Sequence, residues 1–327
     1  MASSDVYNLK GIDGVFKNTL TNDLQDNLLE FFDWALLEKG NYFNVTKGEL
    51  SPRGSDYSRL RLASNSQYTE GQVWEGFRSN WVWQSGVTHT PAQLVGTVNN
   101  TPGVSGVYVD DVFYASSGTT GTYAHNIDHF NGRVIFDSPI PTGSKVQAEY
   151  SYKYINVVYA NSVPWLRQIQ YRTYEPNGEF LTAGKGAWDD NPEKRLQLPA
   201  IAIEVVPRRQ MRGYQLGGGQ WVQTDILFHC IAEDSITRNA LVDMVSFQND
   251  KTIHMFNSNS IADSGHFPLD YIGSPFSKAK MYPDLAKDHY SKDIRLQNAS
   301  IQGMDMINNN LFGGIVKLTA EVIQTNI

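Results

Sequence analysis

Apolar and polar residues alternate one by one in two well-separated parts of this chain. Near the C-terminal end, Val316 to Val322 place Val, Leu, Ala and Val on one side and Lys, Thr and Glu on the other. The same period of two recurs from Val146 to Tyr154. It is typical of a β-strand with one buried face, so each part needs another layer to cover it. The 17 Tyr, 15 Phe, 7 Trp, 27 Gly and 13 Pro support a β-rich fold with many turns.

The middle of the chain, residues 71–160, is predicted to be an inserted all-β domain. Asn131-Gly132 separates two strand-like runs, and this dipeptide is the strongest short signal for a hairpin with a type I′ turn. A second turn is expected at Pro139–Gly143, before the alternating run that ends at Tyr154.

The N-terminal segment, residues 1–70, is predicted to contain an amphipathic helix and a long loop. The helix is expected from Thr21 to Glu38, with a start capped by one of the three residues 21–23 and with Gly40 after its end. One face of this helix is apolar: Leu20, Leu24, Leu28, Phe31, Phe32 and Ala35. The polar stretch Asn44–Tyr68 is expected to be a loop that is ordered by a partner or by the rest of the fold.

The last third, residues 199–327, follows a polar connector, 161–198, and is predicted to be an α+β core in the order β-β-α-β-β. Ile201, Ile203 and Val205 form one face of a strand, and Trp221–Ile231 forms the next. A helix capped by Asp234 or Ser235 comes third; its expected apolar face is Ile236, Ala240, Leu241, Met244 and Val245. Two strands follow, near Ile294–Met306 and through Val316–Val322. With the N-terminal helix, this predicts an antiparallel or mixed sheet with two packing helices.

Charge and composition exclude several classes of protein. A formal net charge of −7 disfavours a nucleic-acid binder, because phosphate neutralisation needs surplus Lys and Arg. No apolar run is long enough to span a bilayer, and the first residues lack the pattern of a signal peptide, so we expect folding in a cytoplasm. The single cysteine, Cys230, lies among apolar residues and is interpreted as a core thiol.

Motifs for catalysis are missing or weak, and we predict neither an enzyme nor a cofactor. His125, Asp128 and His129 could ligate a metal, but on a strand Asp128 would point away from both histidines, which favours a hydrated hairpin arm. Gly217-Gly218-Gly219 precedes a strand and is interpreted as a turn or bulge, since a phosphate-binding loop opens a helix. The acid pairs at 110–111 and 189–190 point apart on an extended chain.

Two groups of surface candidates remain. The first is basic and could form contacts between subunits: Arg208, Arg209 and Arg212 in an expected loop between core strands, and Arg53, Arg59 and Arg61 in the long polar loop. The second is aromatic and could stack on a carbohydrate: Trp74, Trp81 and Trp83. For the aromatic group, packing in the core is the favoured interpretation.

Two stretches resemble structural proteins of tailed-bacteriophage virions. Val107–Asp110, Tyr123–Phe136 and Val146–Tyr152 are similar to a β-module of phage neck, tail and baseplate proteins. Pro199–Glu204, Leu216–Gly219 and Trp221–Ile231, with the helix from Ser235, resemble the core of tail terminator proteins. Simple terminators are much shorter, so the β-module would be an insertion.

The resemblance implies a structural subunit of a homo-oligomeric ring, expected to be a hexamer, in the tail or neck of a virion. Such a ring would cap the tail tube and join it to the head connector, with tube, sheath and connector proteins as partners. Nucleic acid would only pass through its lumen, and no membrane is involved. The alternative is a baseplate, collar or fibre-associated carbohydrate-binding module.

Overall fold

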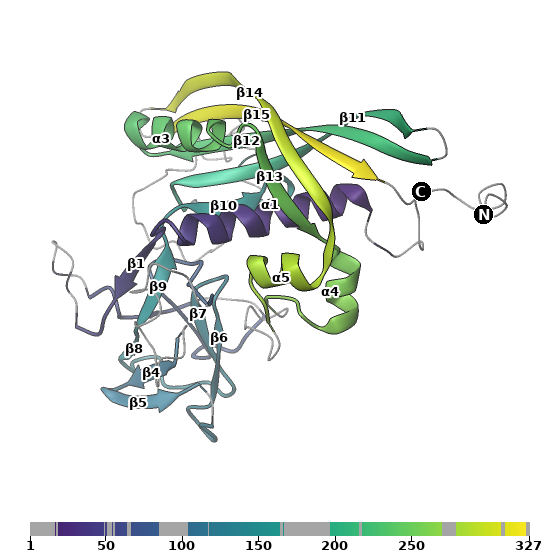
Figure 1. Cartoon of the computed structure of the whole chain (residues 1–327). Helices are drawn as coiled ribbons and strands as arrows, with labels where there is room; N and C mark the ends of the chain where they lie inside the picture. Colours follow the sequence, from purple (N-terminus) through teal and green to yellow (C-terminus); the bar gives the residue numbers. More distant parts are fainter. Residues whose placement is uncertain are drawn as a thin grey trace.

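The computed structural model describes residues 17, 19–48, 50, 54, 56–63, 67–84, 104–116, 118–163, 166, 197–215, 218–269, 279–308 and 311–324. These residues form a mixed α+β structure that consists mostly of strands, which confirms the predicted class. Figure 1 shows a curled sheet, the helix α1 beneath it, and a group of small sheets on the other side of α1. None of the described helices is long and apolar enough to cross a membrane.

The curled sheet has six strands in the order β10-β11-β12-β15-β14-β13. Neighbouring strands are antiparallel except β10 and β11, which run parallel, so the sheet is mixed. We call it the large sheet; its strands are β10 (Asn156–Tyr159), β11 (Ala200–Gln215), β12 (Gly218–Ala232), β13 (Lys251–Phe256), β14 (Tyr290–Asn308) and β15 (Leu311–Gln324).

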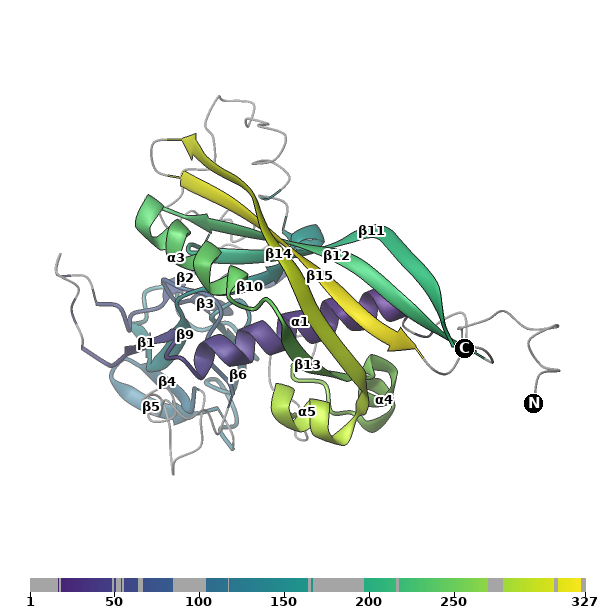
Figure 2. The same ribbon diagram turned by 45° about the horizontal axis from the view of Figure 1, so that its top comes forward.

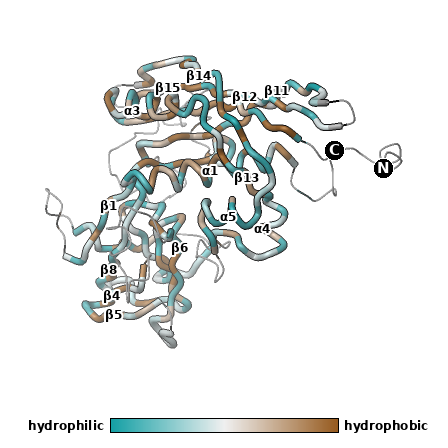
Figure 3. The backbone as a smooth tube through the Cα atoms, viewed as in Figure 1, coloured by the Kyte–Doolittle hydropathy of each residue, from teal (hydrophilic) through white to brown (hydrophobic). Residues whose placement is uncertain are grey.

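Two helices, α1 (Leu20–Leu37) and α3 (Ser235–Ser246), pack on the large sheet and share one apolar core with it. From α1, the predicted Leu24, Leu28, Phe31 and Phe32 are buried there, and Leu20 and Ala35 pack beside them. From the strands come alternate residues, among them Ile201, Ile203, Ile226, Phe228, Val316, Leu318, Ala320 and Val322. In Figure 3 the hydrophobic segments gather where the sheet meets α1. The predicted amphipathic patterns therefore identified this core correctly.

The ends of α1 differ in part from the prediction. The helix begins at Leu20 with Thr19 as its N-cap, so the expected cap among residues 21–23 is wrong. Asp23 is instead buried, and its carboxylate accepts a hydrogen bond from the backbone N–H of Ser258. The predicted end is confirmed: Gly40 has a φ of 86° and follows the last turn as a helix-ending glycine does.

The buried face of α3 also differs from the prediction. Asp234 caps the helix as expected and accepts from the backbone N–H of Thr237. However, Ile236 is 80% exposed and Ala240 is exposed, whereas Arg238 is buried and donates to the carbonyl of Gly313. The helix is rotated this way because it approaches β15 very closely at a glycine, Gly314, beside which an arginine stem fits.

A separate group of small sheets surrounds a second apolar core, and we call it the β-module. Its sheets have the orders β1-β9, β2-β3-β7-β6 and β5-β4-β8. At the centre of the core Trp81 stacks on Tyr150, with ring centroids 4.3 Å apart. The strands are β1 (Tyr42–Val45), β2 (Arg61–Leu62), β3 (Val73–Glu75), β4 (Gly106–Val109), β5 (Val112–Ala115), β6 (His125–Asp128), β7 (Arg133–Phe136), β8 (Val146–Ala148) and β9 (Tyr150–Lys153).

The observed strand pairing gives the β-module other boundaries than the predicted 71–160. The stretch 44–68 was expected to be a loop, yet β1 pairs with β9 and β2 pairs with β3. At the other end, β10 pairs with β11 and belongs to the large sheet. The module's strands therefore extend from Tyr42 to Lys153, between α1 and β10. Figures 1 and 2 both show α1 passing between the two groups of sheets.

The tight two-residue turn lies at a different hairpin from the one predicted. β6 and β7 do form a hairpin, but Asp128 pairs with Arg133, so four residues connect them and only Gly132 among them has a positive φ. Between β4 and β5 the turn has two residues, Asp110 and Asp111, with φ of 48° and 69°. Positive φ at both positions is the signature of a type I′ turn, which aspartate tolerates.

Three elements of the last third were not predicted. The edge strand β13 and the short helices α4 (Ser258–Ser264) and α5 (Tyr282–Asp288) lie between α3 and the predicted strand near Ile294, where the β-β-α-β-β order has no element. Each helix has only seven residues, which is too short for a clear helical period. The observed order within 199–327 is therefore β-β-α-β-α-α-β-β among the described residues.

We expect Gly314→Ala to destabilise the fold. A Cβ at this position would lie 2.5 Å from Cγ2 of Val242 on α3, so the helix must shift. Such overpacking typically lowers the free energy of unfolding by about 1–3 kcal/mol. Gly303→Ala in the partner strand β14 is the matched control, because its nearest neighbour would lie at 3.9 Å. Urea unfolding of both variants measures the difference, and equal midpoints would contradict the close approach of α3.

Candidate functional site

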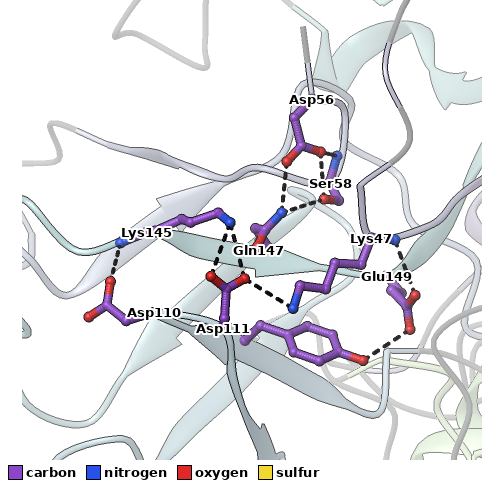
Figure 4. Close-up of polar contacts among 9 residues, drawn as sticks. Lys47, Asp56, Ser58, Asp110, Asp111, Lys145, Gln147 and Glu149 are labelled. Atoms are coloured by element: carbon purple, nitrogen blue, oxygen red, sulfur yellow. Dashed lines mark hydrogen bonds and ion pairs between the residues drawn. The ribbon is translucent and has the colours of Figure 1, made fainter.

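The most extensive polar cluster lies on the β-module, where the chain after β1 meets the β4–β5 turn and β8. Asp111 lies between two lysines: its carboxylate is 3.0 Å from Nζ of Lys145 and 3.1 Å from Nζ of Lys47 (Figure 4). Hydrogen bonds from these two ammonium groups lower the pKa of Asp111. Lys47 also lies over the ring of Tyr108, 4.3 Å from its centroid. The cluster thus fastens a segment of the predicted long loop to the module.

A second part of this cluster holds the segment around Asp56. The carboxylate of Asp56 accepts from the hydroxyl of Ser58 at 2.6 Å and from Nε2 of Gln147 at 2.7 Å (Figure 4). Glu149 accepts from the backbone N–H of Lys47 at 3.1 Å. Every carboxylate drawn in Figure 4 therefore has a donor within the protein. These hydrogen bonds tie the segments around Lys47 and Asp56 to Gln147 and Glu149, so the cluster orders loops.

The histidine and aspartate group of the β6–β7 hairpin is buried, so the predicted hydrated arm is wrong. Asp128 is 1% exposed, lies 2.8 Å from Nε of Arg133, and accepts from Asn131. The Nδ1 atom of His125 lies 2.8 Å from the carbonyl of Tyr123, and burial lowers the pKa of this imidazole. Asp128 thus stabilises the hairpin loop. Within the described part of the chain, no three or more His, Cys, Asp or Glu side chains gather where they could hold a metal ion.

Cys230 has the surroundings predicted for it. The thiol lies in the core of the large sheet, and burial raises its pKa to about 12. It is therefore a protonated core residue at neutral pH rather than a reactive thiolate. Of the three predicted turn glycines, Gly219 has a φ of 91° at the start of β12, as a strand entrance with a glycine turn requires. Gly217 lies outside the described residues, as do Asp189 and Asp190.

The polar side of α1 carries a row of acids that the sequence reading missed. Asp33 accepts from Nζ of Lys153 at 2.6 Å and from Nε2 of Gln84 at 2.8 Å, and all three side chains are buried. Asp26 accepts from the hydroxyls of Tyr159 and Ser258. The signal was present, because Asp23, Asp26, Glu30 and Asp33 recur at helical spacing and form a second stripe.

Within this row of acids, Glu30 has a pKa far above its ordinary value. Burial, followed by the nearby charge of Asp33, raises its pKa to about 8. At neutral pH this carboxyl is therefore mostly protonated. The charges of Asp33 and Asp26 oppose its ionisation, and the charge of Lys153 favours it.

The basic cluster of residues 207–212 lies within β11, not in a loop. Arg209 pairs with Thr224 and Arg212 with Trp221, so the backbone continues as a strand after a register shift that begins at Val205. Arg208 occupies the shifted segment of the same strand. The guanidinium of Arg212 is exposed. A strand that extends beyond the core need not alternate apolar and polar residues, so the sequence pattern does not reveal this part of β11.

The remaining basic candidates are scattered. Arg59 is exposed, and its backbone forms an isolated β-bridge with Gln147. Arg61 is exposed on β2. Arg53 lies outside the described residues. Arg59 and Arg61 belong to the β-module, whereas Arg212 belongs to the large sheet, so the fold places them in different groups of sheets.

The tryptophans proposed for carbohydrate binding belong largely to the core. Trp74 is 3% exposed and Trp81 is fully buried, so neither presents a ring face to a sugar. Trp83 is half-buried. This result supports the packing interpretation that the sequence favoured and corrects the carbohydrate hypothesis for Trp74 and Trp81.

The β11–β12 hairpin lies at one end of the large sheet and the end of β14 with α3 lies at the other (Figures 1 and 2), and both places expose apolar side chains. At one end the β11–β12 hairpin projects beyond the core and exposes half or nearly half of three apolar side chains. This hairpin surface consists of Tyr214 and Ile323 on one face of the hairpin and Met211 on the other. At the other end β14 and α3 form the edge surface, which consists of Ile236, Ile301, Met304 and Met306. Ile236 and Met306 are 80% and 63% exposed.

The backbone at both surfaces has a free edge. β10 pairs with β11 only over Ala200–Ile203, and β13 pairs with β14 only over Tyr290–Leu296. Beyond these spans, no described strand pairs with the outer edge of β11 or β14. Exposed strand edges with apolar side chains commonly pair with another chain.

Comparison with known proteins identifies no relative. No protein-family model matches this chain, and no curated protein matches it in sequence.

The two kinds of ion pair described above should differ strongly in their contribution to stability. Lys153→Met leaves Asp33 buried without its cation, and we expect a loss of about 3–5 kcal/mol in the free energy of unfolding. Asp111→Asn breaks pairs on an exposed carboxylate, so its effect on the free energy of unfolding should be much smaller and should fade in high salt. Chemical unfolding at low and at high salt measures the effect of each variant. Similar losses in the free energy of unfolding would contradict a buried ion pair between Asp33 and Lys153.

Glu30 should make the fold less stable as pH rises. Its pKa is raised in the folded state to about 8 from the ordinary 4.5, so ionisation opposes folding between these values. The penalty grows from roughly 1 kcal/mol at pH 5 to roughly 4 kcal/mol at pH 8. Glu30→Gln should remove this slope and stabilise the protein at pH 8. Urea midpoints across this range test it, with Glu233→Gln on an exposed position as control; an unchanged slope in Glu30→Gln would disprove it.

Proposed function

We propose that this chain is a structural protein of a tailed-bacteriophage virion that assembles into a closed ring at the tail or neck. As a tail terminator or neck subunit, it would cap the tail tube and join it to the head connector. Its partners would be copies of itself, as a hexamer, together with tube, sheath and connector proteins. DNA would pass through the lumen without specific recognition, and the chain would have no catalytic role.

The observation that carries this proposal is the pair of unlike apolar surfaces at opposite ends of one sheet. A head-to-tail interface needs two different patches, because each subunit contacts one neighbour with each patch. The hairpin surface and the edge surface meet this requirement, and each lies beside a free strand edge. One subunit's β11–β12 hairpin would pack against β14 and α3 of the next.

The arrangement of the core also supports the terminator-like interpretation. One helix near the N-terminus and one between strands cover the same face of the large sheet. This is the arrangement that the resemblance to terminators implies, with the β-module inserted between α1 and β10. In the ring the module would extend towards the sheath or collar. Arg212 on the projecting hairpin would contact the neighbouring subunit.

Mixing two interface variants tests the head-to-tail arrangement. Met211→Asp/Tyr214→Asp damages only the hairpin surface, and Met304→Asp/Met306→Asp damages only the edge surface. Each variant alone should be a monomer, because burying an unpaired carboxylate in an interface is costly. An equimolar mixture should stop at a heterodimer, since only one intact pair of surfaces remains. Light scattering coupled to gel filtration gives the masses, and the wild type should give a ring.

The control is Phe130→Asp, which places the same charge on a 60% exposed aromatic of the β-module, away from both surfaces. This variant should still form rings. A wild-type protein that stays monomeric at high concentration would overturn the proposal, and so would rings formed by both double variants. A particle reconstruction that finds the chain outside the tail and neck would refute the assigned position.

A further inference from the structure

Two histidines far apart in the sequence converge where the short helices α4 and α5 end. His266 follows α4, and His289 follows α5 directly. Nδ1 of His266 and Nε2 of His289 lie 2.8 Å apart, and the ring centroids are 5.0 Å apart. Figures 1 and 2 show the two helices side by side at one edge of the molecule. Two imidazole nitrogens at this distance share a proton, and a metal ion that replaces this proton would hold them slightly further apart, each about 2.0–2.1 Å from the ion.

Two serines of α4 hold His289 in place. The hydroxyl of Ser260 lies 2.8 Å from Nδ1 of His289, and the hydroxyl of Ser264 lies 3.4 Å from Nε2. When Nδ1 donates its proton to Ser260, Nε2 carries the lone pair that faces His266. A metal-binding histidine is commonly oriented in this way, by a hydrogen bond at the nitrogen that does not bind the metal. The imidazole of His289 is also 9% exposed, so its orientation is restricted.

We propose that His266 and His289 bind a divalent transition-metal ion of the zinc type through Nδ1 and Nε2 respectively. Imidazole nitrogens suit zinc, nickel and copper, and water would complete the coordination. With two protein ligands the site binds weakly and exchanges its metal readily. The bound ion would fasten the end of α4 to the start of β14. This site is independent of ring assembly, because its residues belong to neither exposed apolar surface.

Other described histidines lack this convergence. His254 pairs with Asp293 at 2.7 Å on the surface, and His229 pairs with Glu204 at 2.7 Å. Each of these has one carboxylate and no second imidazole within hydrogen-bond distance. His254 is therefore a suitable control, because removing it takes away one exposed imidazole and leaves the proposed site intact.

Calorimetric titration of the full-length protein with Zn²⁺ tests the proposal, supported by the visible spectrum of the Co²⁺ form. Wild type should bind one ion per chain with a rise in melting temperature. His266→Asn should abolish both effects, whereas His254→Asn should leave them unchanged. Ser260→Ala, which removes only the hydrogen bond that orients His289, should weaken Zn²⁺ binding about 10-fold. Circular dichroism confirms that each variant is folded.

The results separate the outcomes clearly. Saturable binding that disappears in His266→Asn and persists in His254→Asn supports the site, even if His289→Asn fails to fold. Wild type without saturable binding of Zn²⁺ overturns it. Binding retained by His266→Asn also overturns it, because the ion would then lie elsewhere. Zn²⁺ binding is measured without any need for assembly. A monomeric wild type would therefore refute the ring and leave this test unaffected.

Discussion

The position of helix α1, buried on two sides, is the constraint on which the rest of the structure depends. Its apolar face packs on the large sheet, and its polar face is also shielded from water. Buried polar groups need partners. Asn27 exchanges two hydrogen bonds with the backbone of Phe256, and Asn41, just after the helix, does the same with Ile155. These amides connect α1 and the residues just after it to β13 and to the bend before β10, which follow by more than a hundred residues.

The same helix joins the β-module to the large sheet. Asp33 contacts Lys153 of the module, and Asp26 contacts Tyr159 in β10, at the point where the chain leaves one group of sheets for the other. A protonated Glu30 between them lowers the repulsion within the row. The two parts are therefore joined by a hydrogen-bonded seam as well as by the chain itself.

Covering one face of the large sheet with two helices leaves its ends free to extend. The strands β11, β12, β14 and β15 are much longer than the core they cover, and their ends expose apolar side chains. Most polar residues elsewhere that first suggest chemistry, among them Asp111, Asp128 and Asp56, are used for internal ion pairs and loop contacts. The converging pair His266 and His289 differs, because a nitrogen of each imidazole lies within hydrogen-bond distance of the other.

The sequence by itself determined the local elements: the helix Leu20–Leu37, the cap at Asp234, and the alternating faces of β12 and β15. The apolar residues of each element recur with a regular period within a short stretch, because one side of the element is buried. Only the tertiary structure decided which segments meet: β1 beside β9, β10 parallel to β11, Trp81 inside a core, and His266 against His289. These pairings depend on contacts between distant segments, and no local period encodes them. The same holds for Ile236, since Gly314 rather than the helix's own pattern sets which side of α3 is buried.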